Sequence, residues 1–526
     1  MTAQAISARP AQARPAQATP GQPTPLTGGT LWLAGFLLAI GNFMVVLDMT
    51  IANVSVPNIA GGLAVSSSQG TWVITSYSVA EAIMVPLTGW LAGRFGTVRM
   101  FLFGITGFGI CSALCGLAPS LPALVLFRVM QGLCGGPIMP MSQTLMMSIF
   151  PPQQRGQAMG LWSMTTVVAP IAGPILGGVL CDTVGWEWIF FINVPVVAAC
   201  AFFAWRLLTS QETPTEKRKV DVVGLGLLIT FVGALQIMLD KGKELDWFGS
   251  PVIVGLGIVS AVAFAAFLIW ELTEENPIVN VRIFRHRGFT SSVITISLTF
   301  GSFFASIVLV PLWLQTNMGY TATWTGYATA WGGVLAVVMS PIVAQLMGKF
   351  DSRLLVSFGV LWLAGIAVIR SGLASNATYW TVALPFLAQG LAMPFFFIPT
   401  SQLALSSVEP QETASAAGLS NFMRTMSAAF ATSLITTAWE NTSTRNHADM
   451  AGILNDPMGV VATLMNGGLS HEQAVSQLDA LTTGQAVMAA TDQMFLVTSV
   501  VFVVAAAVVW LAPKQTGPMA PGGGGH

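Results

Sequence analysis

Several ionisable side chains interrupt apolar stretches of this 526-residue chain, and three of them are the main candidates for chemistry. Asp48 lies in FMVVLDMTIANVSVP, Glu81 in SYSVAEAIMVP and Arg128 in FRVMQGLCGG. Charged groups inside such stretches are costly, and they commonly serve ion or substrate pathways. A carboxyl group in a low-dielectric environment binds a proton more readily, whereas a nearby arginine favours its ionised form. We therefore expect Asp48 and Glu81 to load and release protons, and Glu81 alternatively to bind a cationic substrate.

A purely structural role is the alternative for each of these groups. Asp48 can be solvated near the outer interface of a helix. Arg128 should face the protein interior and pair with a carboxylate or a carbonyl, because an unpaired arginine at that depth is expensive. Such a buried ion pair can simply fix the register of the helices.

Other chemistries lack their sequence patterns. No nucleophile–base pattern accompanies the acids, and no GxxxxGK[ST] loop provides a built-in ATPase. His471 and Glu472 have no second histidine four residues on, so a zinc protease motif is absent. The five cysteines lie in or at the ends of apolar runs, as small core residues do. We expect neither an enzyme nor a bound metal or cofactor.

The composition places these groups in a membrane. The chain is 54% hydrophobic and only 8% charged, whereas soluble domains carry roughly 25% charged residues. A net charge of −1 offers no basic face for nucleic acid. An all-α polytopic membrane protein in a lipid bilayer is the remaining class.

Fourteen segments are long and apolar enough to be spanning helices, which need about 20 residues each. They are roughly 31–55, 69–92, 99–118, 121–147, 157–180, 188–208, 222–239, 251–271, 289–315, 324–347, 353–373, 380–405, 415–438 and 491–512. With a cytoplasmic N-terminus, fifteen of the 21 Lys and Arg residues fall on the cytoplasmic side. The positive-inside rule therefore predicts that both termini are cytoplasmic.

The chain also echoes itself. QGLCGGPIMPMSQ (131–143) resembles QGLAMPFFFIPTSQ (389–402), and GRFGTVRMFLFG resembles GKFDSRLLVSFG at nearly the same offset. This duplication predicts two six-helix bundles with two further helices inserted between them, and such paired bundles place a substrate site near the membrane midplane. The repeat sets Asp48 opposite Ser302, so the scaffold itself does not require an acid there. The expected divisions are a disordered tail (1–30), the first bundle (31–208), the inserted pair (209–288), the second bundle (289–512, including a long periplasmic loop, 440–490) and a flexible tail (513–526).

Several motifs resemble one known family. LDMTIANVSVP, QGTWVITSYSVAEAIMVPLTGWLAGRFG, WSMTTVVAPIAGPILGG and WEWIFFINVP are similar to segments of the major facilitator superfamily, specifically of its fourteen-span, EmrB-like drug:proton antiporters. The resemblance implies the major facilitator fold and export of hydrophobic drugs in exchange for protons. It also implies that Asp48 and Arg128 take part in proton coupling. Glu81 departs from it, because that family more often has an uncharged residue there.

The resemblance assigns further sites. It implies a hinge and seal in APIAGPILGG, with mere close packing as the alternative; its residues are Pro170, Gly173, Pro174, Gly177 and Gly178. It implies a cytoplasmic gate in GWLAGRFG and the following residues, namely Gly89, Arg94, Gly96 and Arg99, although Gly93 replaces the family's usual acid. Aromatic side chains suit planar hydrophobic substrates, and the candidate cavity residues of this kind are Phe43, Trp162, Trp331, Phe395, Phe396 and Phe397. Arg424, which falls inside a span, is a further cavity candidate.

Partners follow from the same resemblance. The resemblance implies a multi-pass protein of the bacterial inner (plasma) membrane. EmrB-like exporters work with a periplasmic membrane-fusion adaptor (EmrA-like) and an outer-membrane channel (TolC-like), which together form a tripartite pump. The loops 440–490 and 240–250 are the candidate contacts. Two other functions stay open: a proton-coupled importer or uniporter of a small organic solute, and a non-transporting sensor or scaffold on the same fold.

Overall fold

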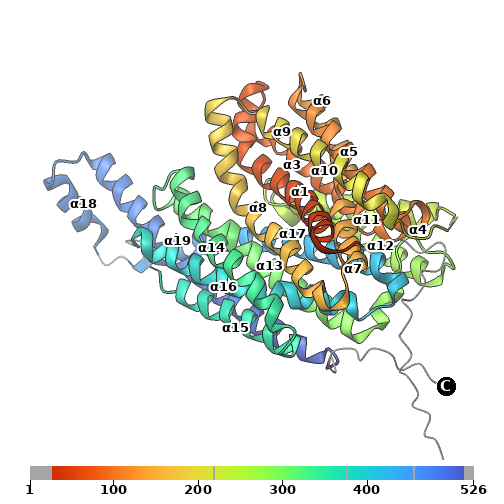
Figure 1. The fold of residues 1–526 in the computed structure, drawn as a ribbon. Helices are drawn as coiled ribbons and strands as arrows, with labels where there is room; N and C mark the ends of the chain where they lie inside the picture. Colours follow the sequence, from red (N-terminus) through yellow and green to blue (C-terminus); the bar gives the residue numbers. More distant parts are fainter. Residues whose placement is uncertain (1–25, 217–218, 374–376, 454–455, 515–526) are drawn as a thin grey trace, which may run out of the picture.

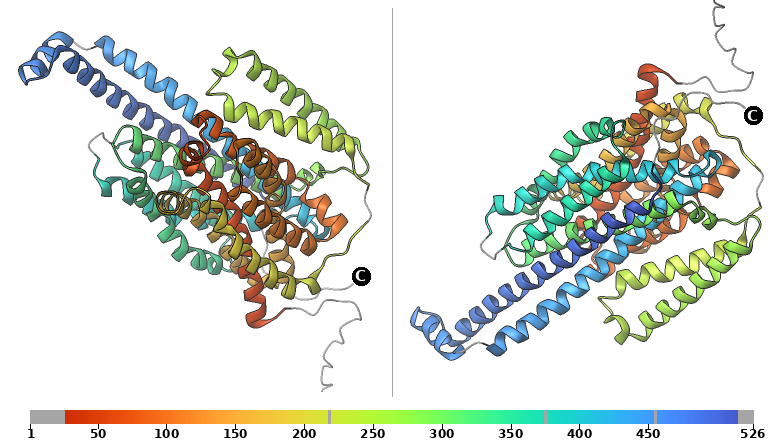
Figure 2. Two further views of the ribbon diagram at one scale, coloured as in Figure 1. Left: turned by 90° about the horizontal axis from the view of Figure 1, so that it is seen from above. Right: turned by 90° about the horizontal axis from the view of Figure 1, so that it is seen from below.

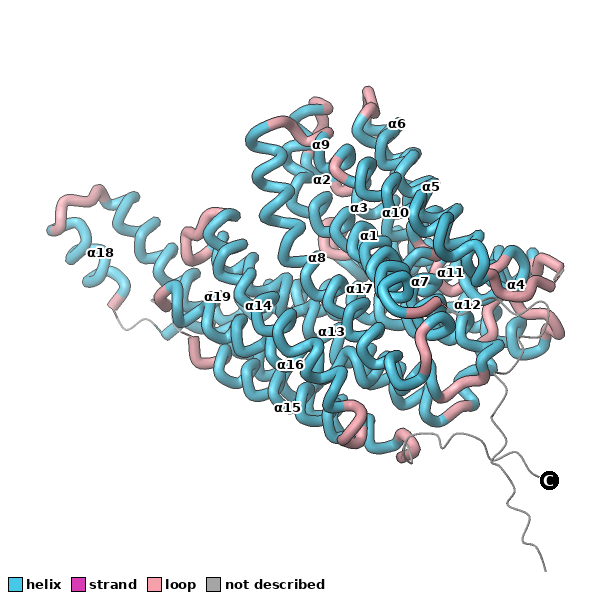
Figure 3. The backbone as a smooth tube through the Cα atoms, in the orientation of Figure 1, coloured by secondary structure: helices cyan, strands magenta, loops and turns pink. Residues whose placement is uncertain are grey.

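The computed structural model describes residues 26–216, 219–373, 377–453 and 456–514. Every regular element in these ranges is helical (Figure 3). Most of the tails expected at 1–30 and 513–526 lie outside the described residues. The helices form two bundles and an inserted hairpin, as the sequence predicted (Figure 1).

The first bundle contains ten helices, some of them short segments of one broken span. They are α1 (Gly28–Gly62), α2 (Ser67–Gly70), α3 (Trp72–Met84), α4 (Thr88–Phe95), α5 (Thr97–Gly116), α6 (Leu121–Gly135), α7 (Ile138–Ile149), α8 (Arg155–Thr183), α9 (Trp188–Phe191) and α10 (Asn193–Leu208). The inserted hairpin is α11 (Val222–Lys241) and α12 (Pro251–Thr273). The second bundle comprises α13 (Arg287–Thr316), α14 (Ala322–Leu346), α15 (Ser352–Arg370), α16 (Tyr379–Ser406), α17 (Thr413–Ile453), α18 (Pro457–Asn466) and α19 (His471–Val508).

Among the described residues, eleven helices are long and apolar enough to cross a membrane, and bent α8 makes twelve when it counts as one span. Two of the fourteen expected spans are not among them. The span expected at 69–92 is divided into α2, α3 and α4, and Pro86, which has no backbone N–H, lies at the second break. The span expected at 415–438 is part of α17, whose sequence is too polar to be counted. Fourteen spans therefore stay a prediction.

The two bundles repeat the same packing. Helix α1 packs on α8 as α13 packs on α17, and α3 packs on α6 as α14 packs on α16. Likewise α5 contacts α10, and α15 contacts α19. This correspondence pairs α6–α7 with α16 and α8 with α17, which is the pairing that the repeated sequence segments indicated. The duplication is thus visible in three dimensions.

The inserted hairpin lies beside the bundles rather than between them (Figure 2). Only α11 of the pair packs on both α3 and α17. After α11, Trp247 Nε1 donates to Thr437 Oγ1 at 3.0 Å, and Ser433 Oγ donates to Leu239 O at 2.9 Å. The hairpin is therefore attached to the rim of the second bundle as well as to the first.

The molecule has two distinct ends. We call the end at which α1 begins and α19 finishes the terminal end. The opposite end, where α17 and α19 are joined through α18, is called the hairpin end. At the hairpin end, α17 and α19 continue past the bundles as a pair joined through α18 (Figure 2). Residues 440–490, expected as a loop, are therefore mostly helical. Trp439 Nε1 donates to Thr491 Oγ1 at 2.9 Å, His447 pairs with Asp479 at 3.1 Å, and a Ser470–Gln473 capping box begins α19.

Candidate transport site

Asp48 and Arg128 form a buried ion pair inside the first bundle. Arg128 Nη1 lies 2.5 Å from Asp48 Oδ2, and both side chains are 1% exposed. The other carboxylate oxygen, Oδ1, accepts from Gln131 Nε2 at 3.0 Å and from Asn193 Nδ2 at 2.7 Å. Arg128 Nε also donates to Val73 O at 3.0 Å. Helices α1, α3, α6 and α10 are thus tied together at one point.

Several members of this network were not among the sequence candidates. Gln131 follows Arg128 by three residues, so both lie on one face of α6. Asn193 sits in the motif WEWIFFINVP and also donates to Ser112 Oγ at 3.0 Å. The sequence offered one signal for Gln131, namely a polar residue one helical turn after an arginine in an apolar run. Nothing in the sequence connected Asn193 with Asp48, because 145 residues separate them.

Glu81 is buried on α3 without a complete set of partners. Its side chain is 3% exposed, and its Oε2 accepts no hydrogen bond from any described residue. The close packing of α3 on α6 depends on glycine, because a Cβ at Gly132 would lie 2.5 Å from Tyr77 O. A Cβ at Gly136 would lie 3.0 Å from Glu81 O. A buried carboxyl with an unoccupied oxygen has the character expected of a proton-binding group.

Arg424 comes from the second bundle and reaches the interface with the first. It is 3% exposed, its Nη2 contacts Met139 Sδ of α7, and its Nε has no hydrogen-bond partner among the described residues. The guanidinium lies 5.0 Å from the ring centroid of Phe300 and 5.4 Å from that of Phe397. Trp162 of the first bundle stacks on Phe397, with centroids 6.1 Å apart. Aromatic rings from both bundles therefore surround this cation.

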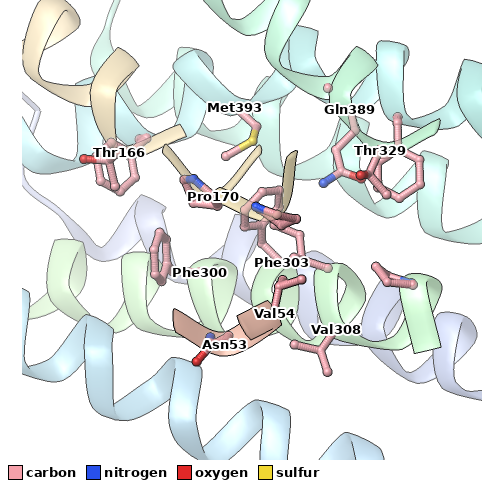
Figure 4. Close-up of a pocket in the computed structure, with 16 residues that line it drawn as sticks. Asn53, Val54, Thr166, Pro170, Phe300, Phe303, Val308, Thr329, Gln389 and Met393 are labelled. Atoms are coloured by element: carbon pink, nitrogen blue, oxygen red, sulfur yellow. The ribbon is translucent and has the colours of Figure 1, made fainter. Parts of the chain in front are cut away.

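A cavity of about 390 Å³ lies between the two bundles. Figure 4 shows lining side chains from α1, α8, α13, α14 and α16 around one space. Its lining is mainly apolar and aromatic, with a few polar groups: Asn53, Val54, Thr166, Pro170, Pro174, Phe300, Phe303, Ile307, Val308, Pro311, Thr329, Gly332, Phe386, Gln389, Met393 and Phe397. Apolar walls with a few polar groups suit a hydrophobic or amphipathic small molecule.

The candidate cavity residues take different places. Trp162 and Arg424 border the cavity through the Phe300 and Phe397 rings. Phe396 is fully buried against Phe397. Of the candidates, only Phe397 is itself among the lining residues. Phe43 packs against the hydrophobic core, Trp331 donates from Nε1 to Tyr379 Oη at 3.1 Å, and Phe395 packs on Phe358. Composition alone cannot separate aromatic residues that line a cavity from those that pack between neighbouring helices.

The proline- and glycine-rich motif of α8 lies along the cavity and against α1. Pro170 and Pro174 line the cavity, and α8 bends by 43° between its segments Pro152–Pro170 and Ala172–Thr183. A Cβ at Gly173 would overlap Thr50 Oγ1, and one at Gly177 would lie 3.3 Å from Ile51 O. Gly178, in contrast, faces open space. The motif therefore combines a bend with a close helix contact.

The glycines of the GWLAGRFG motif permit close approaches at the terminal end. A Cβ at Gly89 of α4 would overlap Ser415 of α17, so this contact joins the two bundles. Gly96 has φ +94°, a backbone conformation that favours glycine. Glu212 accepts from the backbone N–H groups of Val98 at 3.0 Å and Arg99 at 2.9 Å.

Glu212 thus caps the N-terminus of α5. It also supplies a carboxylate beside the GWLAGRFG motif, in which Gly93 stands at the position of the family's usual acidic residue. Arg99 Nε lies 3.8 Å from the same carboxylate, and Arg94 lies over the ring of Trp90 at 5.3 Å. Glu212 was missed because it follows the motif by more than a hundred residues.

These features define a class of protein. Two repeated helical bundles enclose an apolar cavity at their interface, and buried charges lie beside it; this is the architecture of a secondary transporter. Comparisons with known proteins agree. The Major Facilitator Superfamily profile matches residues 38–432.

Similar proteins include the multidrug export protein EmrB of Escherichia coli, which is 43% identical over 510 residues that cover 95% of this chain and 99% of EmrB. The fatty acid resistance protein FarB of Neisseria gonorrhoeae is 42% identical, with 95% and 99% covered. Among solved structures, the human organic anion transporter MFSD10 matches with a TM-score of 0.55 at 14% identity, covering 90% of this chain and 98% of that one. The chain belongs to the major facilitator superfamily. It is accordingly a multi-pass membrane transporter and not an enzyme.

Proposed function

We propose that this transporter exports hydrophobic and amphipathic drugs in exchange for protons. The observation that carries the proposal is the apolar cavity between the bundles, with the buried Arg424 lying against two of its lining rings. Planar apolar molecules suit the rings of Phe300, Phe303, Phe386 and Phe397 that line it. The 43% identity to a multidrug export protein supports the same substrate class.

The terminal end is the cytoplasmic end in this proposal, because most Lys and Arg residues gather there. Closure at that end is supported by the contact of Gly89 with Ser415 and by the hydrogen bond from Asn421 to Gln143 Oε1 at 2.8 Å. Drug enters from the cytoplasm or the inner leaflet when this end opens. Protons reach Asp48 or Glu81 from the opposite side, and drug and proton bias one two-state equilibrium in different directions.

Proton exchange is tested with purified protein in proteoliposomes that contain a pH-sensitive dye. Exchange predicts that adding a cationic drug drives proton movement in the opposite direction to the drug. Movement in the same direction would instead support a symporter, and no movement would support a sensor or scaffold.

Glu81→Gln should abolish the coupled proton movement while the protein stays folded and membrane-inserted. The matched control is Glu271→Gln, which alters a fully buried glutamate on α12, outside the interface between the bundles. Normal coupling and normal resistance to cationic drugs in Glu81→Gln would refute the role of Glu81.

We also propose that the chain is the inner-membrane component of a tripartite pump. The projecting part of α17, α18 and α19 supports this, because it extends beyond the bundles at the hairpin end (Figure 2). Exposed apolar side chains occur along it, including Ile453, Met458 and Leu481. Replacing residues 454–470 with a short Gly-Ser linker should reduce co-purification of the periplasmic adaptor. A control variant lacks residues 515–526 instead, and equal adaptor recovery from both variants would eliminate this contact.

A further inference from the structure

One face of α17 is directed at the first bundle on the terminal side of the cavity. Gly418, Asn421 and Arg424 follow one another at three-residue spacing and therefore share a face. A Cβ at Gly418 would lie 2.9 Å from Val85 O, Asn421 donates to Gln143, and Arg424 contacts Met139. This face forms a seam between the bundles.

The seam lies at one end of the cavity. Helix α13 runs from the terminal end, and Phe300 is its first lining residue; α16 runs towards the terminal end, and Phe397 is its last. Arg424 lies against both rings. The guanidinium therefore marks the boundary between the cavity and the closed terminal end.

Glu81 and Arg424 are two incompletely partnered charges from opposite bundles. Glu81 Oε2 and Arg424 Nε both lack hydrogen-bond partners among the described residues, and the two side chains are each 3% exposed. Both residues lie beside the start of α7: a Cβ at Gly136 would lie 3.0 Å from Glu81 O, and Arg424 Nη2 contacts Met139 Sδ three residues further along. Helices α3 and α17 also contact each other, although no ion pair within 4.0 Å is found between the two side chains. Attraction across a low-dielectric interior is stronger than at a surface.

The other ionisable groups near Glu81 belong to the first bundle or to the inserted hairpin. Asp48 and Arg128 also act on Glu81, but they are already paired with each other within the first bundle. The other titratable groups around α3 are Tyr77 on α3 itself, Cys134 on α6, and Asp240 and Lys241 on α11; Lys241 lies over the Trp72 ring at 5.6 Å and pairs with Glu244 at 2.8 Å. Among the charged side chains placed around Glu81 within the described ranges, Arg424 is the one from the second bundle.

We propose that Glu81 and Arg424 form an interbundle charge pair that holds the terminal end closed while Glu81 is ionised. Protonation converts the Glu81 carboxylate to a neutral carboxylic acid, which removes the attraction to α17 and favours opening of the terminal end. Arg424 is then a coupling residue that acts through Glu81. This inference deepens the proposed function and rests on it.

The direction of the effect matches proton-driven export. An exporter must return to its inward-open state with a proton bound and must turn outward after releasing that proton. A carboxylate whose protonation favours opening at the cytoplasmic end provides this sign, because a proton that prefers one state shifts the population towards it. Asp48 cannot act in the same way, since its partners Arg128, Gln131 and Asn193 all belong to its own bundle.

The experiment measures the opening of the terminal end directly. The five native cysteines are replaced, and spin labels are attached at Gln153→Cys in the first bundle and Lys349→Cys in the second. Both positions are exposed, and both lie near the terminal ends of α8 and α14. Pulsed electron resonance then gives the distance distribution between the labels at pH 8 and at pH 6, without substrate or a proton gradient.

The parent protein should shift towards longer distances at pH 6. Glu81→Gln and Arg424→Gln should each show the long distances already at pH 8, with no further change at pH 6. The double variant should resemble either single variant, because both changes break one pair. Exchanging the charges, with Glu81→Arg and Arg424→Glu together, should restore the short distance at pH 8.

Two buried residues of the same types serve as controls. Glu271→Gln alters the inserted hairpin, and Arg370→Gln alters an arginine that lies against Phe386 at 4.2 Å in the second bundle. Both should keep the parental pH response.

A parental response in Glu81→Gln or Arg424→Gln would overturn the proposal, as would loss of the response in both controls. If the distances behave as expected while drug drives no proton movement, drug:proton exchange fails and the charge pair stands. If drug does drive proton movement but the distance between the labels does not change with pH, drug:proton exchange stands and the charge pair fails.

Discussion

Removing one member of the Asp48–Arg128 pair should destabilise the protein strongly. Arg128→Gln deletes the 2.5 Å contact to Asp48 and the hydrogen bond to Val73 O. Asp48 keeps only the amide donors of Gln131 and Asn193, so its charge stays buried without a counter-charge. Breaking a buried ion pair in this way costs roughly 3–5 kcal/mol. We expect a loss of that order in the free energy of unfolding.

The double variant Asp48→Asn/Arg128→Gln provides the matched comparison. It removes both charges and leaves amides that can bond to each other and to Gln131. Since replacing both partners avoids an uncompensated buried charge, the double variant should be more stable than Arg128→Gln alone. Unfolding is followed by tryptophan fluorescence in detergent, on heating and on titration with a denaturing detergent.

The reasoning fails if Arg128→Gln loses less than about 1 kcal/mol, the scale of an exposed ion pair. It also fails if the losses of stability in Asp48→Asn alone and in Arg128→Gln alone add up to the loss in the double variant, because additivity is expected of independent sites. Transport by the double variant is a separate measurement. Loss of proton coupling in this folded variant would assign the pair a role in coupling as well as in stability.

Three further predictions concern the seam, the cavity and the gate. Gly89→Ala should block transport by separating α4 from α17, and the added change Ser415→Gly should restore it only in part in the uptake assay, because it removes the overlapping Oγ and Cβ but leaves Ser415 Cα 2.7 Å from the new Cβ; normal transport by Gly89→Ala alone would count against a close contact there. Phe397→Ala should weaken drug binding by a factor of about 2 to 13, since losing aromatic stacking costs roughly 0.5–1.5 kcal/mol, whereas Phe358→Ala, outside the cavity, should not; equal affinities by fluorescence titration would contradict the cavity assignment. Glu212→Gln should lower the free energy of unfolding by about 1 kcal/mol through loss of a charged cap on α5, and an unchanged melting temperature would show that the cap is dispensable.

Much of the fold follows from local sequence. Long apolar runs specify most spans, and the repeated QGL and Pro-x-Ser-Gln segments indicate the duplicated bundles that the structure shows. Two kinds of element depart from this rule. The segment 69–92 breaks near Pro86, and α17 continues through polar residues to Ile453 because its far half packs against α19 through contacts such as Trp439 with Thr491. Hydropathy alone cannot register support that comes from a distant helix.

The site was predictable to the extent that its groups are chemically conspicuous. A charge within an apolar run identified Asp48, Glu81, Arg128 and Arg424 without any knowledge of their neighbours. Which of these charges lie close to each other depends on how helices α1, α3, α6 and α17 pack. Spacing along the sequence carries no information about that packing. The cavity lining was even less accessible, because Phe300 and Phe303 look like ordinary apolar residues until α13 is placed against α8.

The length of α17 has a mechanical consequence. Its 41 residues form one continuous helix that begins at the terminal end, passes Arg424 at the interface and ends in the projecting tip. The stretch from Arg424 to Ile453 measures about 44 Å at 1.5 Å per residue. A tilt of 10° about Arg424 would therefore displace the tip by about 8 Å, while Arg424 itself stays in place. The helix therefore converts a small tilt beside the cavity into a displacement of several ångströms at its far end, where another protein could bind.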